Sequence, residues 1–534
     1  MSVIPTHRGK RVYEHYSPDV PSDGWDAIVI GSGMGGMSCA TTLSNYGHKV
    51  LLLEQHYLPG GFTHMFGRKG FKWDVGVHVM GEMRPGQIPY KILKWLTDGK
   101  VKMISEGDPF DSFYFPHGFT FHMPEGHQKL IASLKEQFPD EADKLDRYVK
   151  LVKRTDIGSK ALFLFQTLPQ WLEKALAKIW YGVFFTNYWA KTTAEVIDSF
   201  GFSKNLKLAL TSHWGYYGSV PAESAFGVHA LTHTHFWDGA FYPQGGAKMF
   251  AEAMLANVID AGGKVLTKAM VQEVIVKDGR AIGVRMADGK EFRAKWTISA
   301  TGAKTTVNKL LPAALRNESW VKEIAAIKDS PPYLCLNIAF KGDIRAAGAK
   351  GANQWLYSID NNDTQLWNVA DTNERPHLLY LSFPSLKDPE HDPGPEMMHT
   401  GECVTFVDWS LFSQWAGSRF GDREEAYKAF KAEIEERLLA ELRLRLPELM
   451  KLMVFSELST PLTAVHYANA NHGAIYGLCA SPERFCCPSL RVRTPIKNFL
   501  LSGVDVATLG VVSGMTSGIL AATVIDKRAY LRLL

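Results

Sequence analysis

The stretch Asp26-Ala-Ile-Val-Ile-Gly-Ser-Gly-Met-Gly-Gly-Met-Ser-Cys39 largely decides how this chain is expected to fold. Its apolar start, Ala27–Ile30, is short enough for a buried strand, and the chain then turns through a G-x-G-x-x-G spacing at Gly31, Gly33 and Gly36. A predicted helix, Met37–Leu43, follows, and a second predicted strand, Lys49–Glu54, ends in an acid. This order of elements is typical of a dinucleotide-binding unit in an α/β fold.

Each of these residues has a physical role in that interpretation. Gly31 allows the tight turn, Gly33 lets the backbone approach a pyrophosphate, and Gly36 lets the helix pack closely on the strand. The helix N-terminus offers unpaired N–H groups and a partial positive charge to phosphates. Glu54 is expected to accept hydrogen bonds from ribose hydroxyls. The alternative is a glycine-rich turn in an unrelated α/β protein.

Length and composition indicate a large globular protein. The 534 residues predict two or three domains, and the hydrophobic content of 46% and charged content of 21% are ordinary. The net charge of +4 gives no reason to expect a nucleic-acid partner. Aromatic residues make up 12% of the chain, which favours a large apolar pocket, a membrane-facing surface or simply a large aromatic core.

Cysteines and apolar runs bear on where the protein works. The six cysteines are scattered without a C-x-x-C spacing, which favours reduced thiols and a cytoplasmic location. Residues 1–25 lack the apolar core of a signal peptide. No run approaches the roughly 18 apolar residues of a membrane span, so we expect no transmembrane helix and at most a peripheral membrane contact.

Two further motifs follow the first unit directly. They are the doublet Gly60-Gly61 and the spacing Phe71-x-x-Asp74-x-Gly76. Together with the first unit they resemble the flavoprotein superfamily that includes amine oxidases and phytoene desaturases. The resemblance implies an α/β fold with a Rossmann-type FAD-binding domain, assembled from discontinuous segments, and an inserted α+β substrate-binding domain. It also implies non-covalent FAD, rather than NAD, in the first nucleotide site.

The resemblance places further segments beside the cofactor. A strand near Val271 is implied to lie against the adenine, and Asp505 to contact the ribityl and phosphate groups. A final helix opening at Gly510 would point its N-terminus at the flavin. The predicted FAD-binding residues are Gly31, Ser32, Gly33, Gly35, Gly36, Glu54, Gln55, Gly60, Gly61, Phe62, Thr63, Val271, Gly503, Asp505, Gly510, Val511 and Val512.

The expected domains alternate along the chain. We assign residues 25–81, 236–304 and 490–534 to the FAD-binding domain, and residues 82–235 and 305–489 to the substrate-binding domain. Within them, alternation and Asp-Gly turns predict hairpins, and longer amphipathic runs predict helices. The predicted hairpin strands are 110–115 with 119–123 and 269–276 with 281–285 and 291–300; the predicted helices include 126–138, 141–154 and 423–445.

Three segments narrow the resemblance to one branch. Ser459–Thr463, His472–Gly477 and Phe71–His78 look like blocks of the carotenoid isomerase and retinol saturase branch. Two departures are Phe62, where many relatives place Arg or a small residue, and the lack of the signal segment of animal retinol saturases. The second departure favours a microbial-type cytosolic enzyme.

The branch implies hydride exchange between flavin N5 and a long apolar substrate with C=C bonds, a retinoid, carotenoid or other isoprenoid. Such a substrate predicts an apolar tunnel. The candidate catalytic residues are His78, Glu82 and Tyr242, with a structural histidine as the alternative for His78. His229 and His233 are spaced to share a helix face, but no acid or cysteine completes a metal site, so we expect none and place them near the pocket or the flavin.

Residues 160–191 combine nine aromatic side chains with four lysines. This composition fits an amphipathic face at a bilayer interface. It fits equally a helical cap over an apolar pocket.

Three functions remain open on the sequence. The first is FAD-dependent saturation, desaturation or isomerisation of a polyene. The second is an amine-oxidase-like enzyme, which would need an acidic entrance, and the third is a non-catalytic protein that binds flavin or lipid. No second complete G-x-G-x-x-G unit is seen, so NAD(P)H or a quinone would act as a separate electron partner. The sequence leaves the oligomeric state open.

Overall fold

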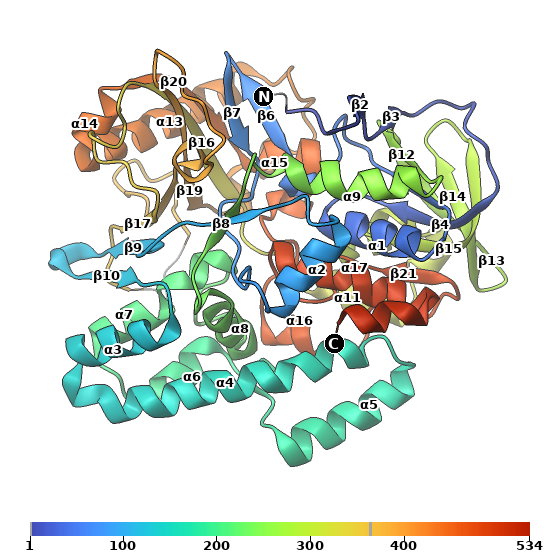
Figure 1. The fold of residues 1–534 in the computed structure, drawn as a ribbon, viewed down its shortest axis with the longest axis horizontal. Helices are drawn as coiled ribbons and strands as arrows, with labels where there is room; N and C mark the ends of the chain where they lie inside the picture. The colour runs from blue at the N-terminus through green and yellow to red at the C-terminus, as the bar shows by residue number, and fades with distance from the viewer. Residues whose placement is uncertain (1–2, 362–365, 534) are drawn as a thin grey trace.

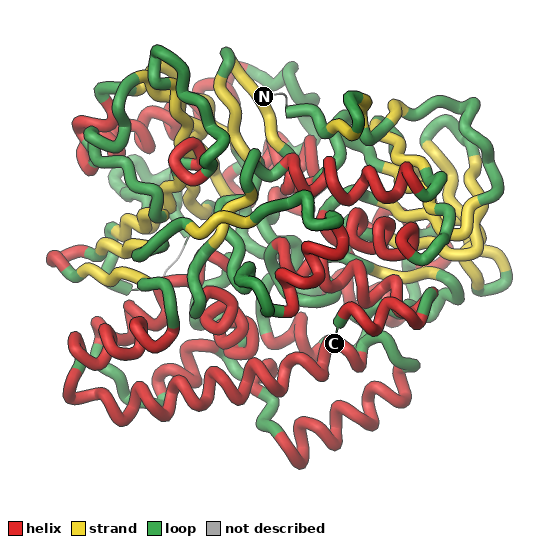
Figure 2. Tube along the Cα trace, in the orientation of Figure 1, coloured by secondary structure: helices red, strands yellow, loops and turns green. Residues whose placement is uncertain are grey.

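The structure is a computed structural model that describes residues 3–361 and 366–533. Two sheets stand side by side and a layer of helices lies beneath one of them (Figures 1 and 2). The chain crosses between the sheets several times, so each is built from segments far apart in sequence. The predicted mixture of a Rossmann-type unit and an inserted α+β unit is confirmed.

The first sheet forms around the glycine-rich stretch. Its central strands are parallel, and β13, β14 and β15 form an antiparallel extension at one edge. The strands in spatial order are β13 Val271–Lys277, β14 Arg280–Met286, β15 Glu291–Ser299, β4 Trp25–Ile30, β5 Val50–Leu53, β12 Lys264–Thr267 and β3 Glu14–His15, with β21 Phe499–Leu501 paired to β15.

Three helices pack on this sheet. They are α1 Met34–Asn45, α9 Lys248–Asp260 and α17 Val511–Ile525. α1 packs against both of the others, and its residues Met34–Ser44 are all buried. The strand β5 reads Val-Leu-Leu-Leu and is entirely buried. This sequence suits its position, because a strand covered on both faces needs apolar side chains throughout. The predicted strand, turn, helix and strand from 26 to 54 are therefore confirmed.

The second sheet is mainly antiparallel. Its strands in spatial order are β10 Thr120–Met123, β9 Asp111–Tyr114, β17 Asn353–Tyr357, β18 Leu378–Ser382, β19 Met398–Phe406, β16 Tyr333–Lys341 and β20 Met453–Ser459. One face packs against α13, Glu425–Arg445, which buries Ile434, Leu438 and Leu442 and exposes its charged side. The predicted hairpin at 110–123 is β9 and β10, and the predicted helix at 423–445 is α13.

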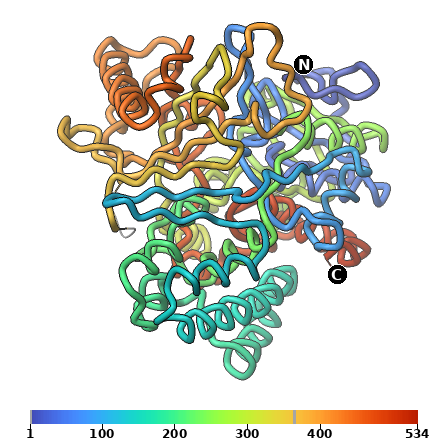
Figure 3. Tube along the Cα trace, turned by 60° about the vertical axis from the view of Figure 1, so that its left-hand side comes forward, coloured from blue at the N-terminus to red at the C-terminus, as the bar shows by residue number. Residues whose placement is uncertain are grey.

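A helical layer covers the other face of the second sheet (Figures 1 and 3). It consists of α3 His127–Gln137, α4 Ala142–Phe165, α5 Gln170–Ile179, α6 Thr193–Asp198, α7 Lys204–Thr211 and α8 Phe226–Phe236. Its apolar side chains form one cluster with Phe113, Trp355 and Tyr380 of the sheet. α4 continues well beyond the predicted end at Arg154, because Leu162, Phe163 and Leu164 pack against the body of the protein.

Candidate active site

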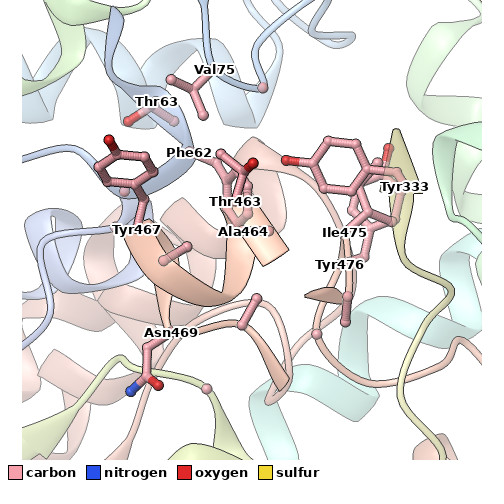
Figure 4. Close-up of a pocket in the computed structure, with 18 of the residues that line it drawn as sticks. Phe62, Thr63, Val75, Tyr333, Thr463, Ala464, Tyr467, Asn469, Ile475 and Tyr476 are labelled. Atoms are coloured by element: carbon pink, nitrogen blue, oxygen red, sulfur yellow. The ribbon is translucent and has the colours of Figure 1, made fainter. Parts of the chain in front are cut away.

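A cavity of about 520 Å³ is lined by residues from both sheets. At one end lie the loops that leave β4, β5 and β15, with Gly31, Glu54 and Thr301. At the other end lie side chains of β16, β17 and β18, among them Tyr333, Trp355 and Tyr380. Figure 4 shows the middle of this space, with Phe62, Thr63 and Val75 across from Tyr333 and Tyr476.

The start of α1 forms an open cradle at the first end. Gly33 is the N-cap residue of α1, and no side chain caps the helix and no acid lies in its first turn. A Cβ atom added to Gly33 would meet nothing within 4 Å, whereas one added to Gly35 would lie 2.7 Å from the Cα of Gly503. The backbone N–H groups of this helix end are therefore left for a ligand, and the space beside Gly33 is the place for an anion.

A second helix N-terminus faces the same cavity. α17 begins at Val511 after Gly510, again without a side-chain cap or an acid in its first turn, and both residues line the cavity. Next to it, the carboxylate of Asp505 accepts hydrogen bonds from the backbone N–H of Ala303 at 2.7 Å and of Leu478 at 2.9 Å. Asp505 thus ties three segments together at the wall of the cavity.

Glu54 is held in place by its own loop and by the loop that follows β4. Its Oε2 atom accepts hydrogen bonds from the backbone N–H of Ser32 at 2.8 Å and from its hydroxyl at 2.6 Å, and its Oε1 atom accepts one from the N–H of His56 at 2.8 Å. A carboxylate offers about four acceptor positions, so room for one more donor remains. This arrangement fits a carboxylate that orients a ribose.

Most of the predicted FAD-binding residues line this one cavity. They are Gly31, Gly33, Gly35, Glu54, Gln55, Gly61, Phe62, Thr63, Val271, Gly503, Asp505, Gly510 and Val511. Ser32, Gly36, Gly60 and Val512 lie outside the lining. Ser32 supports Glu54 and donates nothing to the cavity, while Gly36 lets α1 pass against the carbonyl of Gly31.

Two uncapped helix ends and a carboxylate beside an open glycine cradle fit a dinucleotide with its pyrophosphate at Gly33. The residues present therefore fit the flavin cofactor that the sequence implies.

The far end of the cavity is an aromatic wall, defined as Tyr216, Tyr333, Trp355, Tyr380, Phe406 and Tyr476. Three of its polar atoms are bonded to residues behind the rings, outside the cavity lining. The indole N–H of Trp355 donates to Asp111 at 3.1 Å, the Tyr380 hydroxyl donates to Asn353 at 2.9 Å, and the Tyr216 hydroxyl donates to Asp111 at 2.9 Å. The wall therefore offers mainly apolar ring surface to the cavity, which suits an apolar ligand.

A buried ion pair lies behind this wall. Lys387 and Glu106 are 3.0 Å apart, with side chains almost wholly buried. Lys387 also donates to the carbonyl of His78 at 2.9 Å and to Asn353 at 2.6 Å. Burial raises the pKa of Glu106 to about 7, and Lys387 beside it acts in the opposite direction. This network anchors both the wall and the segment that carries His78.

His78 is the one candidate catalytic residue that lines the cavity. Its Nδ1 atom lies 2.9 Å from Oε2 of Glu402, whose side chain is 1% exposed. Its ring packs edge-on against Tyr380, with 5.3 Å between centroids. In the part of the chain that the structure describes, no hydrogen bond to Nε2 is found. Nδ1 therefore faces the buried carboxylate, and Nε2 is the nitrogen available to a ligand.

The other two candidates do not line the cavity. Glu82 pairs with His235 at 3.0 Å on the outer side of the segment. Tyr242 is buried and donates its hydroxyl hydrogen bond to Asp74, whose other oxygen accepts from the N–H of Ala247 at 2.9 Å. Asp74 itself lines the cavity, and burial raises its pKa to about 7. Glu82 and Tyr242 are close in sequence to the flavin motifs, but neither residue lines the cavity.

The histidines of α8 are core residues rather than pocket or flavin-facing residues. His229 lies 2.8 Å from the hydroxyl of Tyr148, and His233 lies 2.8 Å from the carbonyl of Leu210. Burial lowers the pKa of His233 to about 3 and that of His229 well below its ordinary value, so both are neutral. Across residues 3–361 and 366–533 no group of His, Cys, Asp and Glu side chains is arranged to hold a metal ion.

Sequence reasoning missed Glu402, Asp111 and Lys387. A signal was present for Glu402, because an acid stands inside the otherwise uncharged strand β19. Acids are almost never buried in a strand without a partner, so such a residue predicts a functional or structural pairing. Its partner, His78, lies more than three hundred residues away, and no local pattern connects the two.

Residues 160–191 contribute nothing to the lining of the cavity. The interpretation of this segment as a helical cap stays a prediction; its Trp189 is buried, and Tyr181 and Tyr188 pack against the core of the helical layer. The aromatic side chains of the wall come instead from Tyr216 and from 333–476. As for membrane insertion, no helix among the described residues is both long and apolar enough to cross a bilayer.

Comparison with known proteins agrees with this geometry. The family model described as flavin containing amine oxidoreductase matches residues 34–526. An all-trans-retinol 13,14-reductase of Rattus norvegicus is 33% identical over 94% of this chain and 86% of its own length. A chloroplastic prolycopene isomerase of an Oncidium hybrid is 28% identical over 85% of this chain and 75% of its own length.

A solved structure shares the fold. Putrescine oxidase bound to putrescine superimposes with a TM-score of 0.61 at 15% identity, covering 95% of this chain and all of that one. At that identity the likeness concerns the fold alone.

Proposed function

Because this chain belongs to the flavin containing amine oxidoreductase family, and is thus a flavin-dependent oxidoreductase, we propose that it reduces a C=C bond of a long apolar polyene or isoprenoid lipid with FAD as its flavin. One observation carries the proposal. A single cavity joins the cradle at Gly33 to an aromatic wall in which Tyr216, Trp355 and Tyr380 bond their polar atoms behind the rings. The relatives named as retinol reductases and prolycopene isomerases support the same class of substrate.

FAD is the flavin that the cradle favours, since two helix N-termini and Glu54 suit a pyrophosphate and a ribose, which a mononucleotide lacks in this form. When bound, the flavin supplies the group that gives or takes a hydride. We infer that a separate partner carrying NAD(P)H or a quinone exchanges electrons with it.

We propose that His78 handles the proton. Saturating a C=C bond consumes one hydride and one proton, and the proton must come from the protein or from water. His78 lines the cavity next to the aromatic wall, and the carboxylate of Glu402, 2.9 Å from Nδ1, leaves Nε2 as the nitrogen that would give the proton. Glu402 acts through His78 and is a positioning residue.

We infer a cytoplasmic setting from the cysteine usage alone, and a lipid phase as the source of the substrate, since a polyene partitions into lipid.

An amine substrate is the second candidate, on the fold of putrescine oxidase. The cavity lining includes Arg68, Arg423 and Lys431, and Arg68 pairs with Glu457 of the same lining at 3.4 Å. Arg423 and Lys431 repel a protonated amine, which weighs against this substrate.

The test is an anaerobic mixing experiment. The purified protein is reduced until the flavin absorbance is bleached, and is then mixed with all-trans-retinol, a carotenoid or a diamine. We expect the retinoid or carotenoid to restore the oxidised flavin spectrum and to yield a product two hydrogens heavier. A polyene that changes geometry while the flavin stays reduced would establish isomerisation instead. No change with any polyene would overturn the proposal.

The role of His78 is tested with His78→Gln and the control Glu82→Gln. The first variant is expected to keep its bound flavin spectrum and to reduce the polyene about a hundredfold or more slowly, because the proton donor is gone. The control changes an acid outside the cavity and is expected to match the parent within about twofold. Equal rates in His78→Gln and the parent, across the whole pH profile, would remove His78 from the mechanism.

A further inference from the structure

Helix α5 and the π-turn after it, Trp180–Phe184, have no buried residue. Four large apolar side chains stand in solvent here: Trp171 and Val183 are each 72% exposed, Ile179 is 53% and Phe184 is 54% exposed. In Figures 1 and 3 this segment hangs below α4, away from both sheets. Among the described residues it is the largest gathering of exposed apolar side chains within one short segment.

The exposed side chains share one face. Trp171, Ala175 and Ile179 are four residues apart, so they line up on an α-helix, and all three are exposed. Lys174 and Lys178 are exposed along the side of the same row. The helix's single acid, Glu173, is turned inward to Arg491 at 2.6 Å. The outward face therefore carries apolar and positively charged side chains only.

The segment is held firmly by the protein. Arg493 donates to the carbonyl of Thr167 at 2.7 Å, and Arg491 donates to the carbonyl of Leu168. At the other end, Trp180 and Tyr181 both donate to the carbonyl of Gly158, at 3.0 and 3.1 Å. Because these polar atoms are bonded inward, the outer face is fixed in place with its apolar side chains pointing out.

We propose that the α5 surface, defined as Trp171, Lys174, Lys178, Ile179, Val183 and Phe184, docks on a lipid bilayer that carries anionic head groups. Apolar side chains with lysines beside them match a bilayer interface, where the chains enter the acyl region and the ammonium groups meet phosphates. A tryptophan is favoured at that depth. A cap over the cavity is the alternative role, and the cavity lining contains none of these residues.

The docking is inferred from this surface alone. Its benefit to the protein rests on the proposed function, because a protein that reduces a polyene gains by lying where that substrate dissolves.

The test is sedimentation of the full-length, flavin-loaded protein with extruded vesicles of phosphatidylcholine, with and without phosphatidylserine. The parent protein is expected to pellet with the anionic vesicles, and Trp171 emission to shift to the blue. The double variant Trp171→Glu/Val183→Glu and the pair Lys174→Glu/Lys178→Glu are each expected to bind about tenfold or more weakly. The control is Leu444→Glu, whose parent side chain is 68% exposed in α13, and it is expected to bind like the parent.

Flavin absorbance and the melting temperature confirm that each variant is folded. Binding of the double variant at the level of the parent would overturn the proposal. So would a dimer in gel filtration without lipid that Trp171→Glu/Val183→Glu breaks, because a second copy would then be the occupant. Vesicle binding by a protein that reduces no polyene would refute the proposed function and leave the docking intact.

Discussion

Asp74 is a buried carboxyl whose charge is costly. Its two oxygens accept hydrogen bonds from Tyr242 and Ala247, which favour the ionised form, but burial outweighs them and raises the pKa to about 7. Glu402 nearby adds to the rise. A folded-state pKa above the ordinary value means that the protonated form is favoured by folding. Its contribution to stability is present at low pH and is lost as the pH rises through about 7.

The variant Asp74→Asn is expected to remove this loss of stability at higher pH. The amide keeps an acceptor for Ala247 and places its NH₂ toward the Tyr242 oxygen, without a charge. The difference in melting temperature between the variant and the parent should grow in favour of the variant as the pH goes from about 5 to about 8. Part of the slope remains, because Glu106 also has a pKa raised to about 7 by burial. Thermal scans at each pH measure the difference, with exposed Asp140→Asn as the control. A constant difference across the pH range would contradict the assignment.

His78 and Lys387 show why single residues were hard to assign. The spacing Asp74-x-Gly-x-His78 predicted that His78 lies near the cofactor, and the structure places it at the cavity. Lys387 ends the short helix α12, Pro384–Lys387, which no sequence pattern predicted, yet it pairs with Glu106 and supports His78 in the core. Such a pairing joins residues hundreds of positions apart, and neither sequence stretch carries any trace of it.

At the scale of elements, the contact between α1 and α17 sets the geometry of the cradle. A Cβ atom added to Gly518 would lie 2.7 Å from the N of Cys39, and closer still to the carbonyl of Gly35. Real Cβ atoms do not approach backbone this closely, so the two helices meet only because residue 518 is glycine. Both helices present their N-termini to the cavity. Their spacing therefore decides how well two helix ends serve one ligand.

Gly518→Ala is expected to push α17 away from α1. We predict a loss of about 1–3 kcal/mol in the free energy of unfolding, typical of overpacking, together with weaker flavin retention. Urea titration and the flavin absorbance per protein measure the two effects. Gly417→Ala is the matched control, because its added Cβ would meet nothing within 4 Å. If the two variants behave alike, this helix contact does not control the site.

Elements with strong local patterns were predicted well. The strands β4, β5, β13, β14 and β15, the hairpin at 110–123 and α13 lie close to where apolar runs, alternation or helical periodicity placed them, whereas β3 and β12 were not predicted. The expectation failed for α4, which runs to Phe165, since its last turns are stabilised by packing on the body of the protein rather than by their own sequence. His229 and His233 of α8 were also misplaced by the sequence, because they are bonded inside the helical layer rather than at the pocket or the flavin.

At the scale of the whole molecule, one cavity is assembled from five or more separate stretches of chain. A ligand that bridges them stabilises the folded state, by about 2.7 kcal/mol at a hundredfold excess over its dissociation constant. The division into an FAD-binding domain of three segments and a substrate-binding domain of two stays a prediction. It is consistent with the two sheets, since each draws its strands from several of those segments.

The variant Gly33→Val tests cofactor binding separately from folding. Gly33 has φ −62°, which valine adopts, and its Cβ would point into open space in the flavin-free protein. We expect flavin-free Gly33→Val and flavin-free parent to melt within a few degrees of each other. Added FAD is expected to raise the melting temperature of the parent and to leave the variant unchanged. A variant still stabilised by FAD would place the pyrophosphate elsewhere than beside Gly33.

The sequence by itself determined the dinucleotide unit, the strands and helices around it, and most of the residues at the cofactor end of the cavity. The unit and the elements around it follow from local rules, namely strand and helix periodicity and glycines where the backbone must turn or pass close. Val271 and Asp505 were placed at the cofactor by the resemblance to the flavoprotein superfamily. Only the tertiary structure decided the aromatic wall, the pairing of His78 with Glu402, the exclusion of Glu82 and Tyr242, and the outward face of α5. The reason is that burial and pairing depend on which distant segments meet, and that is settled when the two sheets pack.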